Sequence, residues 1–548
     1  IGIIVWVVRQ KQNDSADYFL GGRDATWLAI GASIFASNIG SEHLIGLAGA
    51  GASSGMAMAH WEIQGWMILI LGWVFVPFYT RSMVYTMPEF LERRYNPQSR
   101  TILSVISLVS YVLTKVAVTV YAGGLVFQQV FGIKELWGID FFWIAAIGLV
   151  VLTALYTIFG GMKSVLYTSV LQTPILLLGS LIILVLGFKE LGGWDEMMRV
   201  CGAVTVNDYG DTMTNLIRSN DDANFPWLGA LIGSAIIGFW YWCTDQFIVQ
   251  RVLSGKNEME ARRGTIFGAY LKLLPVFLFL IPGMIAFALH QKYIGAGGEG
   301  FLPMLANGTA NADAAFPTLV AKLLPAGVKG LVVCGILAAL MSSLASLFNS
   351  SAMLFTIDFY KRFRPETPEK KLVGIGQVAT VVIVILGILW IPIMRSVGDV
   401  LYTYLQDVQS VLAPGIAAAF LLGICWKRTS AQGGMWGLIA GMVIGLTRLG
   451  AKVYYSNAGE VADSTFKYLF YDMNWLFFCG WMFLFCIIVV IVVSLATKAP
   501  TAEKIQGLVF GTATKEQKAA TRASWNHWDI IHTVIILAIT GAFYWYFW

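Results

Sequence analysis

Apolar residues run along this chain in long blocks, and polar or charged residues gather in the shorter segments between the blocks. About 20 consecutive apolar residues are needed for a helix to cross the hydrocarbon core of a bilayer. The pattern therefore predicts an all-α membrane protein. Taking residues 1–8 as the end of a first span, we expect about fourteen spans, the others at about 26–50, 58–79, 102–130, 141–159, 166–188, 227–250, 264–289, 329–357, 372–394, 400–426, 432–450, 475–497 and 528–548.

The span at 26–50 differs from a uniform apolar block. Small and amide-bearing residues occupy 37–41, Ser-Asn-Ile-Gly-Ser, and Glu42 and His43 follow directly. A membrane helix should break here. Backbone groups that a break frees at bilayer depth are tolerated only beside other protein or a water-filled cavity. The break therefore predicts a ligand site.

A second interruption is expected in the span at 227–250, where Gly238, bulky aromatics and Asp245 follow one another. This span lies five spans after the broken one and runs in the opposite direction. Two interrupted helices in that relation are typical of an inverted-topology repeat of five plus five helices. We place the first repeat at 26–188 and the second at 227–426, with peripheral helices at 1–8 and 432–548, all in one membrane domain.

Basic residues assign an orientation to the spans. Most Lys and Arg residues lie in alternate connecting loops, including those around residues 81–100, 251–263, 361–371 and 498–522. The positive-inside rule makes that set cytoplasmic. We expect a multi-pass protein of the plasma membrane, as in a bacterial inner membrane, with both termini and the long loops 189–226 and 291–326 outside.

Composition supports the same class of protein. Hydrophobic residues make up 57% of the 548 residues and charged residues only 13%, so the bilayer is the solvent. The six Cys lie mostly in apolar runs and imply no disulfide framework. The chain has no phosphate-binding Gly-rich loop with Lys, no His/Cys metal spacing and no GxSxG, so an enzyme is not expected. The membrane topology explains the basic loops, and no nucleic-acid partner is expected. The oligomeric state stays unknown.

Several ionisable residues fall at bilayer depth, where each is costly unless it is paired or hydrated. Glu42 and Asp407 fit helix ends, and Lys115 fits a structural ion pair as well as a transport role. Glu62 and Lys272 are better candidates for ligand contacts. A carboxylate accepts hydrogen bonds from hydroxyls and an ammonium donates three. With His43 and Gln406, they predict a polyol site.

The span at 329–357 carries a possible cation site. Ala339, Ser342 and Ser343 stand at positions i, i+3 and i+4, so a carbonyl and two hydroxyls share one helix face. Opposite the break at 36–39, this face predicts a cage of neutral oxygens that suits a monovalent cation. Small residues at this spacing also promote close helix packing, and the spacing alone does not separate the two interpretations.

Long segments of the chain resemble one family. They are DYFLGGRD, GASIFASNIGSEHLIGLAGAG, YTMPEFLERRY, YTIFGGMKSVLYTSVLQT, WYWCTDQFIVQR, YLKLLPVF, LMSSLASLFNSS and GICWKR, in this order. They are similar to the sodium/glucose cotransporters of the solute:sodium symporter family, over nearly the whole chain. The resemblance implies a LeuT-type fold and alternating access, with inward sodium movement coupled to import of a glucose-like or galactose-like monosaccharide.

The resemblance also assigns residues. It implies that Na+ is bound by the carbonyls of Ala36, Ile39 and Ala339 and the hydroxyls of Ser342 and Ser343. It implies a substrate site made of Asn38, His43, Glu62, Gln64, Tyr241, Trp242, Lys272 and Gln406. Tyr241 is expected to stack under the sugar as the inner gate, and the expected outer lid is Leu47, Trp61 and Tyr402.

Two departures from the family pattern matter. Ser169 stands where members with a second sodium site carry Asp, and Ala345 where some carry Thr, so we expect one sodium per sugar. Gly238 replaces a polar residue of some members, and Gln64 replaces Asn or Ser. The contacts to one or two hydroxyls therefore differ, and glucose, galactose and myo-inositol stay open as substrates.

Three alternatives remain at this stage. The nearest is a sodium symporter for another polyol or small organic solute, such as myo-inositol, an amino acid, a carboxylate or sialic acid. The expected substrate residues contain no Arg, which argues against a carboxylate. A channel or solute sensor would lack concentrative uptake. A purely structural membrane protein would not need Glu62 and Lys272 together at bilayer depth.

Overall fold

The computed structural model describes residues 14–40, 42–305, 308–394, 401–457 and 462–548. The first half of the chain contains α2 (Ser15–Leu20), α3 (Trp27–Asn38), α4 (Ala48–Ser54), α5 (Ala59–Glu62), α6 (Gly65–Ile70), α7 (Val76–Ser82), α8 (Met87–Arg94), α9 (Pro97–Ser110), α10 (Ala117–Phe131), α11 (Phe141–Leu191), α12 (Trp194–Gly202), α13 (Trp227–Gly238), α14 (Gln246–Leu253) and α15 (Glu258–Lys272). The second half contains α16 (Ile281–Gly295), α17 (Ala315–Leu323), α18 (Ala326–Met353), α19 (Lys361–Phe363), α20 (Glu369–Met394), α21 (Leu401–Cys425), α22 (Ala431–Asn457), α23 (Thr465–Lys467), α24 (Trp475–Ala496), α25 (Lys515–Ala523) and α26 (His527–Tyr546).

Short π and 3-10 segments join these helices. The π segments are η2 (Glu42–Leu47), η4 (Leu71–Phe75), η5 (Tyr111–Val116), η6 (Phe239–Thr244), η7 (Val276–Leu280), η9 (Leu354–Tyr360) and η10 (Tyr468–Asp472). The 3-10 segments are η1 (Gly21–Arg23), η3 (Gly55–Met58), η8 (Ala312–Ala314) and η11 (Ala502–Lys504). The only strands in the described chain are β1 (Glu135–Leu136) and β2 (Ile139–Asp140), an antiparallel hairpin.

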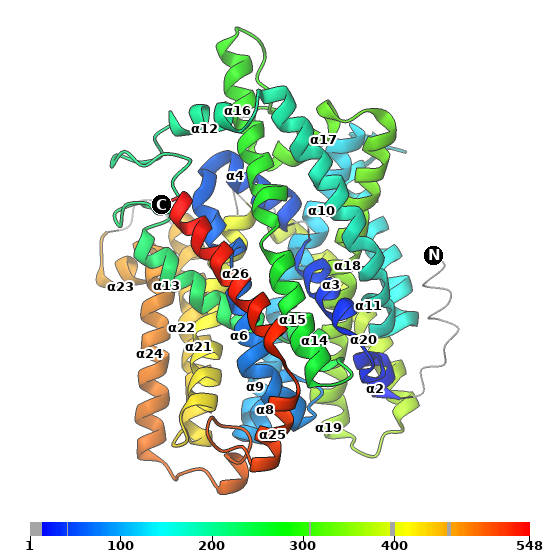
Figure 1. Cartoon of the computed structure of the whole chain (residues 1–548), viewed down its shortest axis with the longest axis vertical. Helices are drawn as coiled ribbons and strands as arrows, with labels where there is room; N and C mark the ends of the chain where they lie inside the picture. The colour runs from blue at the N-terminus through cyan, green and yellow to red at the C-terminus, as the bar shows by residue number, and fades with distance from the viewer. Residues whose placement is uncertain (1–13, 41, 306–307, 395–400, 458–461) are drawn as a thin grey trace.

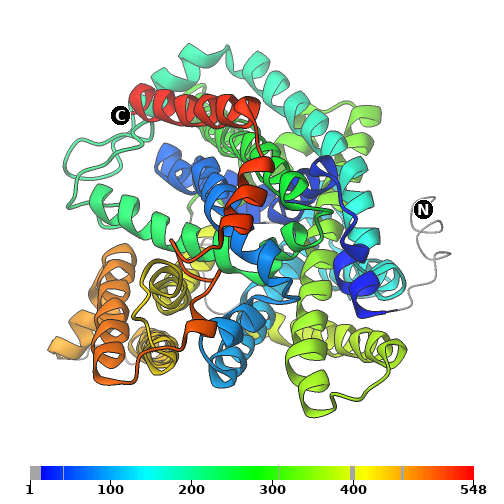
Figure 2. The same cartoon turned by 60° about the horizontal axis from the view of Figure 1, so that its bottom comes forward.

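The long helices form one bundle (Figure 1). α21, α22 and α24 pack together on the side of the bundle away from α2, in both views (Figures 1 and 2). Ten helices of the described chain are long and apolar enough to cross a membrane. A helical membrane protein is thus confirmed, while the count of fourteen spans and the five-plus-five repeat stay predictions.

The number of helices and the number of crossings differ because some helices contain internal breaks. α11 has 51 residues, about 77 Å of helix at 1.5 Å per residue, more than twice the roughly 30 Å hydrocarbon core. Gly161 interrupts it with φ 53° and ψ −152°. A Cβ at this position would lie 2.5 Å from the carbonyl oxygen of Tyr18, so only glycine fits. The two parts of α11 correspond to the spans expected at 141–159 and 166–188.

The expected break in the first complete span is present. α3 ends at Asn38, and Ile39 has extended backbone angles of φ −79° and ψ 99°. The Ile39 N–H still donates to the Phe35 carbonyl at 2.8 Å, and a π segment then runs from Glu42 to Leu47. Ser37, Asn38 and Gly40 are weak helix formers, because Ser and Asn side chains compete for backbone hydrogen bonds and Gly loses the most backbone entropy in a helix.

The second expected break lies at Asp245, which has extended backbone angles between η6 and α14. Two further breaks were not expected from the sequence. α5 ends at Glu62 before Ile63 and Gln64, and α15 ends at Lys272 before Leu273 and Leu274. Pro275 follows the latter break and lacks the N–H that would continue the ladder. Each of these two further breaks directly follows a charged residue of the expected substrate site, Glu62 or Lys272.

Close approach of α3 and α15 depends on two glycines. A Cβ at Gly31 would lie 2.5 Å from the ring of Phe267, and one at Gly264 would lie 2.6 Å from Ile30. Small residues at such crossings let the two backbones come together. The approach brings the C-terminal ends of both helices, at Asn38 and Lys272, to the same region of the bundle.

The two long loops expected outside the membrane, 189–226 and 291–326, are partly helical. The loop 189–226 contains α12, whose buried Met197 and Cys201 attach it to the bundle. The loop 291–326 contains α17, with buried Phe316, Leu319 and Val320. Both are amphipathic helices whose apolar faces cover one end of the transmembrane helices.

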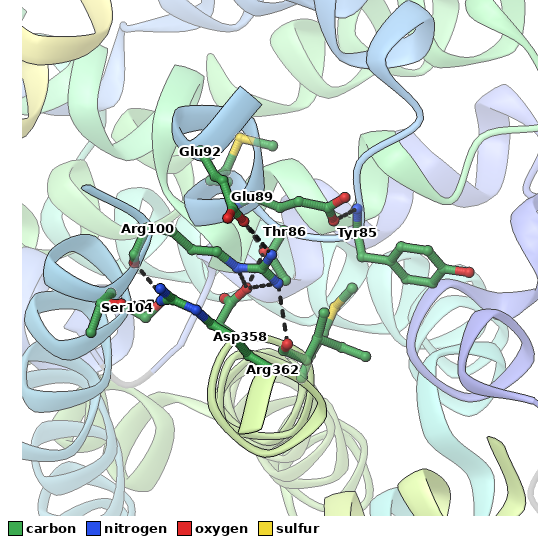
Figure 3. A network of polar contacts seen from close by, with 12 residues as sticks. Tyr85, Thr86, Glu89, Glu92, Arg100, Ser104, Asp358 and Arg362 are labelled. Atoms are coloured by element: carbon green, nitrogen blue, oxygen red, sulfur yellow. Dashed lines mark hydrogen bonds and ion pairs between the residues drawn. The ribbon is translucent and has the colours of Figure 1, made fainter. Parts of the chain in front are cut away.

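A polar network ties α8 and α9 to η9 at the end of α18 (Figure 3). The Arg100 Nε donates to Asp358 Oδ1 at 2.7 Å, and the Thr86 hydroxyl donates to the same oxygen at 2.8 Å. Arg100 Nη1 also donates to Glu92 Oε2 at 2.6 Å. The network therefore joins segments more than 250 residues apart.

Candidate functional site

A cavity lies in the middle of the bundle, beside the break in α3. Its lining residues are Asn38, Glu42, His43, Trp61, Glu62, Gln64, Lys115, Val118, Thr119, Ile237, Gly238, Tyr241, Trp242, Phe247, Lys272, Ser343, Leu347, Leu405, Gln406 and Gln409. The structure brings together all eight residues that the sequence analysis assigned to the substrate. They come from five helical regions that are far apart in the chain.

A continuous set of polar contacts crosses this cavity. Lys272 Nζ donates to Glu62 Oε2 at 2.6 Å and to Asn38 Oδ1 at 3.2 Å. The Asn38 amide nitrogen donates to the Tyr241 hydroxyl at 3.1 Å, and His43 Nε2 lies 3.2 Å from Glu62 Oε2. The side chains of Glu62 and Lys272 are at most 4% exposed. A solute with several hydroxyls finds donors and acceptors alternating along this set.

Gln64 and Gly238 depart from the family pattern as a matched pair. A Cβ at Gly238 would lie 2.4 Å from Gln64 Oε1, so the longer amide occupies space that Gly238 leaves open. Gln64 Nε2 donates to the Ser234 carbonyl at 2.8 Å. Sequence reasoning noted both substitutions and did not connect them, because they lie on helices distant in sequence.

Besides Ser343 of the expected sodium site, four polar residues of the cavity wall were not assigned to the substrate from the sequence: Glu42, Lys115, Thr119 and Gln409. Glu42 Oε2 and Gln406 Oε1 are buried and have no hydrogen-bond partner among the described residues. Helical spacing is the signal that was available. Thr119 follows Lys115 by four residues and Gln409 follows Gln406 by three, which places each pair on one face.

Lys115 lies beneath the expected inner gate. Its ammonium is 4.7 Å from the centre of the Tyr241 ring, and it forms an ion pair with Asp245. The Tyr111 hydroxyl donates to the other Asp245 oxygen. The extended residue between η6 and α14 is therefore held by two side chains from η5, and the Tyr241 ring lies over the same ammonium.

The expected cation face of α18 lies against the break in α3. A Cβ at Gly40 would lie 2.9 Å from the Ser343 hydroxyl oxygen. Ala36, Ile39, Ala339, Ser342 and Ser343 are all buried, with at most 4% exposure. The serines thus face protein rather than lipid.

Ser169 is next to this face. Its hydroxyl oxygen lies 3.2 Å from that of Ser342, and it donates to the Val165 carbonyl at 2.6 Å. The position where some family members carry a carboxylate therefore holds a neutral hydroxyl directly beside the expected sodium site.

The three expected lid residues differ in placement. Trp61 lines the cavity and stacks on Trp475, with ring centroids 5.5 Å apart. Leu47 is fully buried at the end of η2 and is not part of the cavity wall. The side chain of Tyr402 lies outside the described residues.

Comparison with known protein sequences places the chain in a family. The family model described as "Sodium:solute symporter family" matches residues 18–441. Human sodium/myo-inositol cotransporter 2 is 36% identical over 526 residues, which cover 93% of this chain and 77% of that protein. The dog sodium/myo-inositol cotransporter is 37% identical over 525 residues, covering 92% of this chain and 72% of its own.

Solved structures show a shared fold. A Na+-coupled sialic acid symporter in a substrate-bound outward-open state superposes with a TM-score of 0.71 at 22% identity, covering 91% of this chain and 97% of its own. MhsT in complex with L-phenylalanine gives a TM-score of 0.50 at 12% identity, covering 86% and 99%. These neighbours share the LeuT-type helical architecture that the resemblance implies.

The family match covers most of the chain, and the relatives align with it over nearly all its length. The two relatives are named as cotransporters and the sialic acid protein as a symporter, and none of the proteins compared is named as an enzyme. The chain therefore belongs to the sodium:solute symporter family, as a multi-pass membrane transporter that couples movement of a solute to sodium.

Proposed function

We propose that this chain imports a cyclic polyol of the myo-inositol class together with sodium, by alternating access. One observation carries the proposal: eight residues assigned to the substrate from sequence meet in one cavity directly beside the unwound end of α3. The cavity combines a carboxylate and an ammonium with amide side chains. This chemistry suits a neutral solute that presents many hydroxyls and no net charge.

Two observations favour an inositol over the glucose-like monosaccharide expected first. Relatives that are 36–37% identical over more than nine-tenths of the chain are named sodium/myo-inositol cotransporters. The cavity wall also holds a second carboxylate, Glu42, and a further amide, Gln409, beyond the set expected for a sugar. An inositol has a hydroxyl on every ring carbon, so added hydrogen-bonding groups match it. A hexose is the second candidate substrate.

In the proposed cycle, sodium binds between the break at Asn38–Gly40 and the face of Ser342 and Ser343. It stabilises the outward-open form, because a ligand shifts an equilibrium only through different affinities for the two states. Substrate then enters, Trp61 closes over it, and the two helical repeats rock to open the cavity inward. Tyr241, held over Lys115, separates the substrate from the inner side until that movement.

We propose one sodium ion per substrate, because Ser169, which lies beside Ser342, supplies no carboxylate and Ala345 supplies no hydroxyl. One charge crossing 100 mV contributes about 2.3 kcal/mol. A tenfold sodium gradient adds about 1.4 kcal/mol. Together they support a substrate accumulation of a few hundredfold, roughly 1.4 kcal/mol for each factor of ten.

Uptake by the purified protein in proteoliposomes tests the function. Radiolabelled myo-inositol, glucose and galactose are each offered with an inward sodium gradient, with equal sodium on both sides, and with potassium in place of sodium. We expect concentrative uptake of myo-inositol only with the gradient, and weaker uptake of the hexoses. Equal uptake under all three conditions would contradict sodium coupling, and preference for a hexose would select the second candidate.

The stoichiometry has its own test in the same vesicles. Charge and substrate flux are measured together for the wild type and for Ser169→Asp, which places a carboxylate beside Ser342. We expect one charge per substrate in the wild type. Two charges per substrate in the wild type would refute a single sodium site, and an increase in Ser169→Asp alone would support it.

A further inference from the structure

A ladder of hydroxyls leads away from the expected sodium site along α18. Ser342, Ser346 and Ser350 follow one another at intervals of four residues, so they lie on one face of the helix, and all three are buried. On the facing helix α3, the Ser37 hydroxyl oxygen lies 2.6 Å from that of Ser346. In the orientation assigned from the basic loops, this ladder points from the sodium site toward the cytoplasm.

Arg251 lies at the end of this ladder that points toward the cytoplasm. Its Nε donates to the Ser37 hydroxyl at 3.2 Å, and its Nη1 donates to the Ser350 hydroxyl at 3.3 Å and to the Phe247 carbonyl. The side chain is fully buried. Its guanidinium thus bridges α3 and α18 from α14, the helix that follows the break at Asp245.

The charge of this guanidinium is held only by neutral groups. Among the described residues, Arg251 makes no ion pair, and the nearby Asp245 is already bonded to Lys115 and Tyr111. Arg251 Nη2 is buried and has no hydrogen-bond partner in the described part of the chain. A buried, unpaired cation is costly, so it points to a function in transport rather than in stability.

We infer that Arg251 is the inner barrier of the sodium path: its positive charge keeps sodium from leaving toward the cytoplasm until α14 moves. The oxygens that hold the guanidinium are the neutral kind that a sodium ion would use. Two cations at close range in a poorly hydrated interior repel each other strongly. A sodium ion therefore cannot pass Ser37 while Arg251 is hydrogen-bonded to Ser37 and Ser350.

The position of Arg251 would also couple this barrier to the substrate. α14 continues the interrupted helix that carries Tyr241 and Trp242, so inward opening around the substrate moves Arg251 with it. The contacts to Ser37 and Ser350 then break, and the exit opens. Without substrate closure the barrier stays in place, which prevents a sodium leak through the transporter. This inference rests on the proposed sodium-coupled function.

Sodium flux without substrate tests the barrier. Purified wild type and Arg251→Gln are reconstituted into proteoliposomes, and entry of radioactive sodium is measured in the absence of any polyol. Glutamine keeps hydrogen bonds to the serines and removes the charge. We expect the leak to rise about tenfold, because one unit charge at close range is removed from the path. Arg251→Lys keeps the charge and should leak about as little as the wild type.

Arg94→Gln is the matched control. Arg94 is equally buried, but it donates to the Gly423 and Thr429 carbonyls, away from the ladder. Its loss should leave the leak unchanged. Arg251→Met provides a second neutral variant if Arg251→Gln is not recovered as monodisperse protein.

The outcomes separate the two claims. A folded neutral variant with a wild-type leak overturns the inference, as does a leak in Arg251→Lys as large as in the neutral variants. Absence of sodium-driven polyol uptake by the wild type overturns the proposed function instead. A leak confined to the neutral variants, in a protein whose wild type takes up polyol with sodium, supports both.

Discussion

The ammonium of Lys272 lies 2.6 Å from Oε2 of Glu62, and each residue ends its helix immediately before a break. Neither side chain is more than 4% exposed. A buried ion pair contributes little net stability, because desolvation of both charges offsets their attraction. The pair is better explained as a device that keeps a donor and an acceptor ready at fixed positions for the substrate.

Removing one charge of this pair should lower the thermal stability of the protein more than removing both. Glu62→Gln alone leaves Lys272 buried without its carboxylate, a change that costs about 3–5 kcal/mol. The double variant Glu62→Gln with Lys272→Met should recover much of the thermal stability of the wild type. Sodium-driven uptake should stay low in both variants. Thermal denaturation followed by gel filtration and uptake in proteoliposomes measure the two effects.

The double variant provides the decisive comparison. A stable double variant that transports like the wild type would show that the pair is only structural. A double variant as unstable as Glu62→Gln would instead show that the ion pair itself stabilises the fold.

The affinity for sodium and the affinity for substrate should depend on different residues of the cavity. Ser343→Ala removes a hydroxyl that faces Gly40 at the α3 break, and it should raise the sodium concentration for half-maximal uptake about tenfold, near 1.4 kcal/mol. Gln406→Ala removes an amide from the cavity wall and should weaken substrate affinity while sparing sodium. Uptake is measured against sodium at fixed substrate, and then against substrate at fixed sodium.

Ser351→Ala is the control on the same helix, since it deletes a buried hydroxyl of α18 that does not line the cavity. It should leave both concentration dependences unchanged. A Ser343→Ala variant with unaltered sodium dependence would remove Ser343 from the sodium site.

The sequence predicts the break at Asn38 well, because small and amide residues interrupt an apolar block and leave a visible gap in the pattern. The breaks after Glu62 and Lys272 are less visible. Ile63, Leu273 and Leu274 are as apolar as their neighbours, and only Pro275 marks the second break. Here the tertiary environment, rather than local composition, decides where the helix ends.

The residues of the cavity wall also differ in how well the sequence predicts their roles. Charged residues at bilayer depth stand out in a sequence, so Glu62 and Lys272 could be selected without a structure. The role of Lys115 stayed open because its partner, Asp245, lies 130 residues away. The fit of Gln64 into the space left by Gly238 depends on an interatomic distance, which no pattern in a single sequence contains.

Thiol labelling should test the orientation that the basic loops predict. In a background where the exposed Cys334 and Cys425 are replaced by Ser, Asn220→Cys should react with an impermeant maleimide on intact cells. Lys518→Cys should react only after permeabilisation, because its loop belongs to the basic set. Native Cys201 should not react with the maleimide at pH 7–8, since burial raises its pKa to about 12 and leaves almost no thiolate. The opposite labelling pattern would invert the assigned topology.

The network at Asp358 should matter for stability more than its position at the end of α18 suggests (Figure 3). The Asp358 side chain is fully buried, and Arg100 is 12% exposed. Arg100→Gln would leave the carboxylate with the Thr86 hydroxyl but without a cation, and loss of one partner from a buried pair costs about 3–5 kcal/mol. We expect a clearly lower denaturation temperature for the solubilised protein.

Arg362→Gln is the matched control for Arg100→Gln, because Arg362 is exposed and contacts Thr101 and the Pro97 carbonyl near the same helix end. Its loss should change stability by no more than about 0.5 kcal/mol. The double variant Arg100→Gln with Asp358→Asn should recover part of the loss, since no buried charge then remains unpaired. If Arg100→Gln and Arg362→Gln denature at the same temperature, the buried carboxylate does not depend on its arginine. The junction between α8, α9 and α18 must then be held by apolar packing.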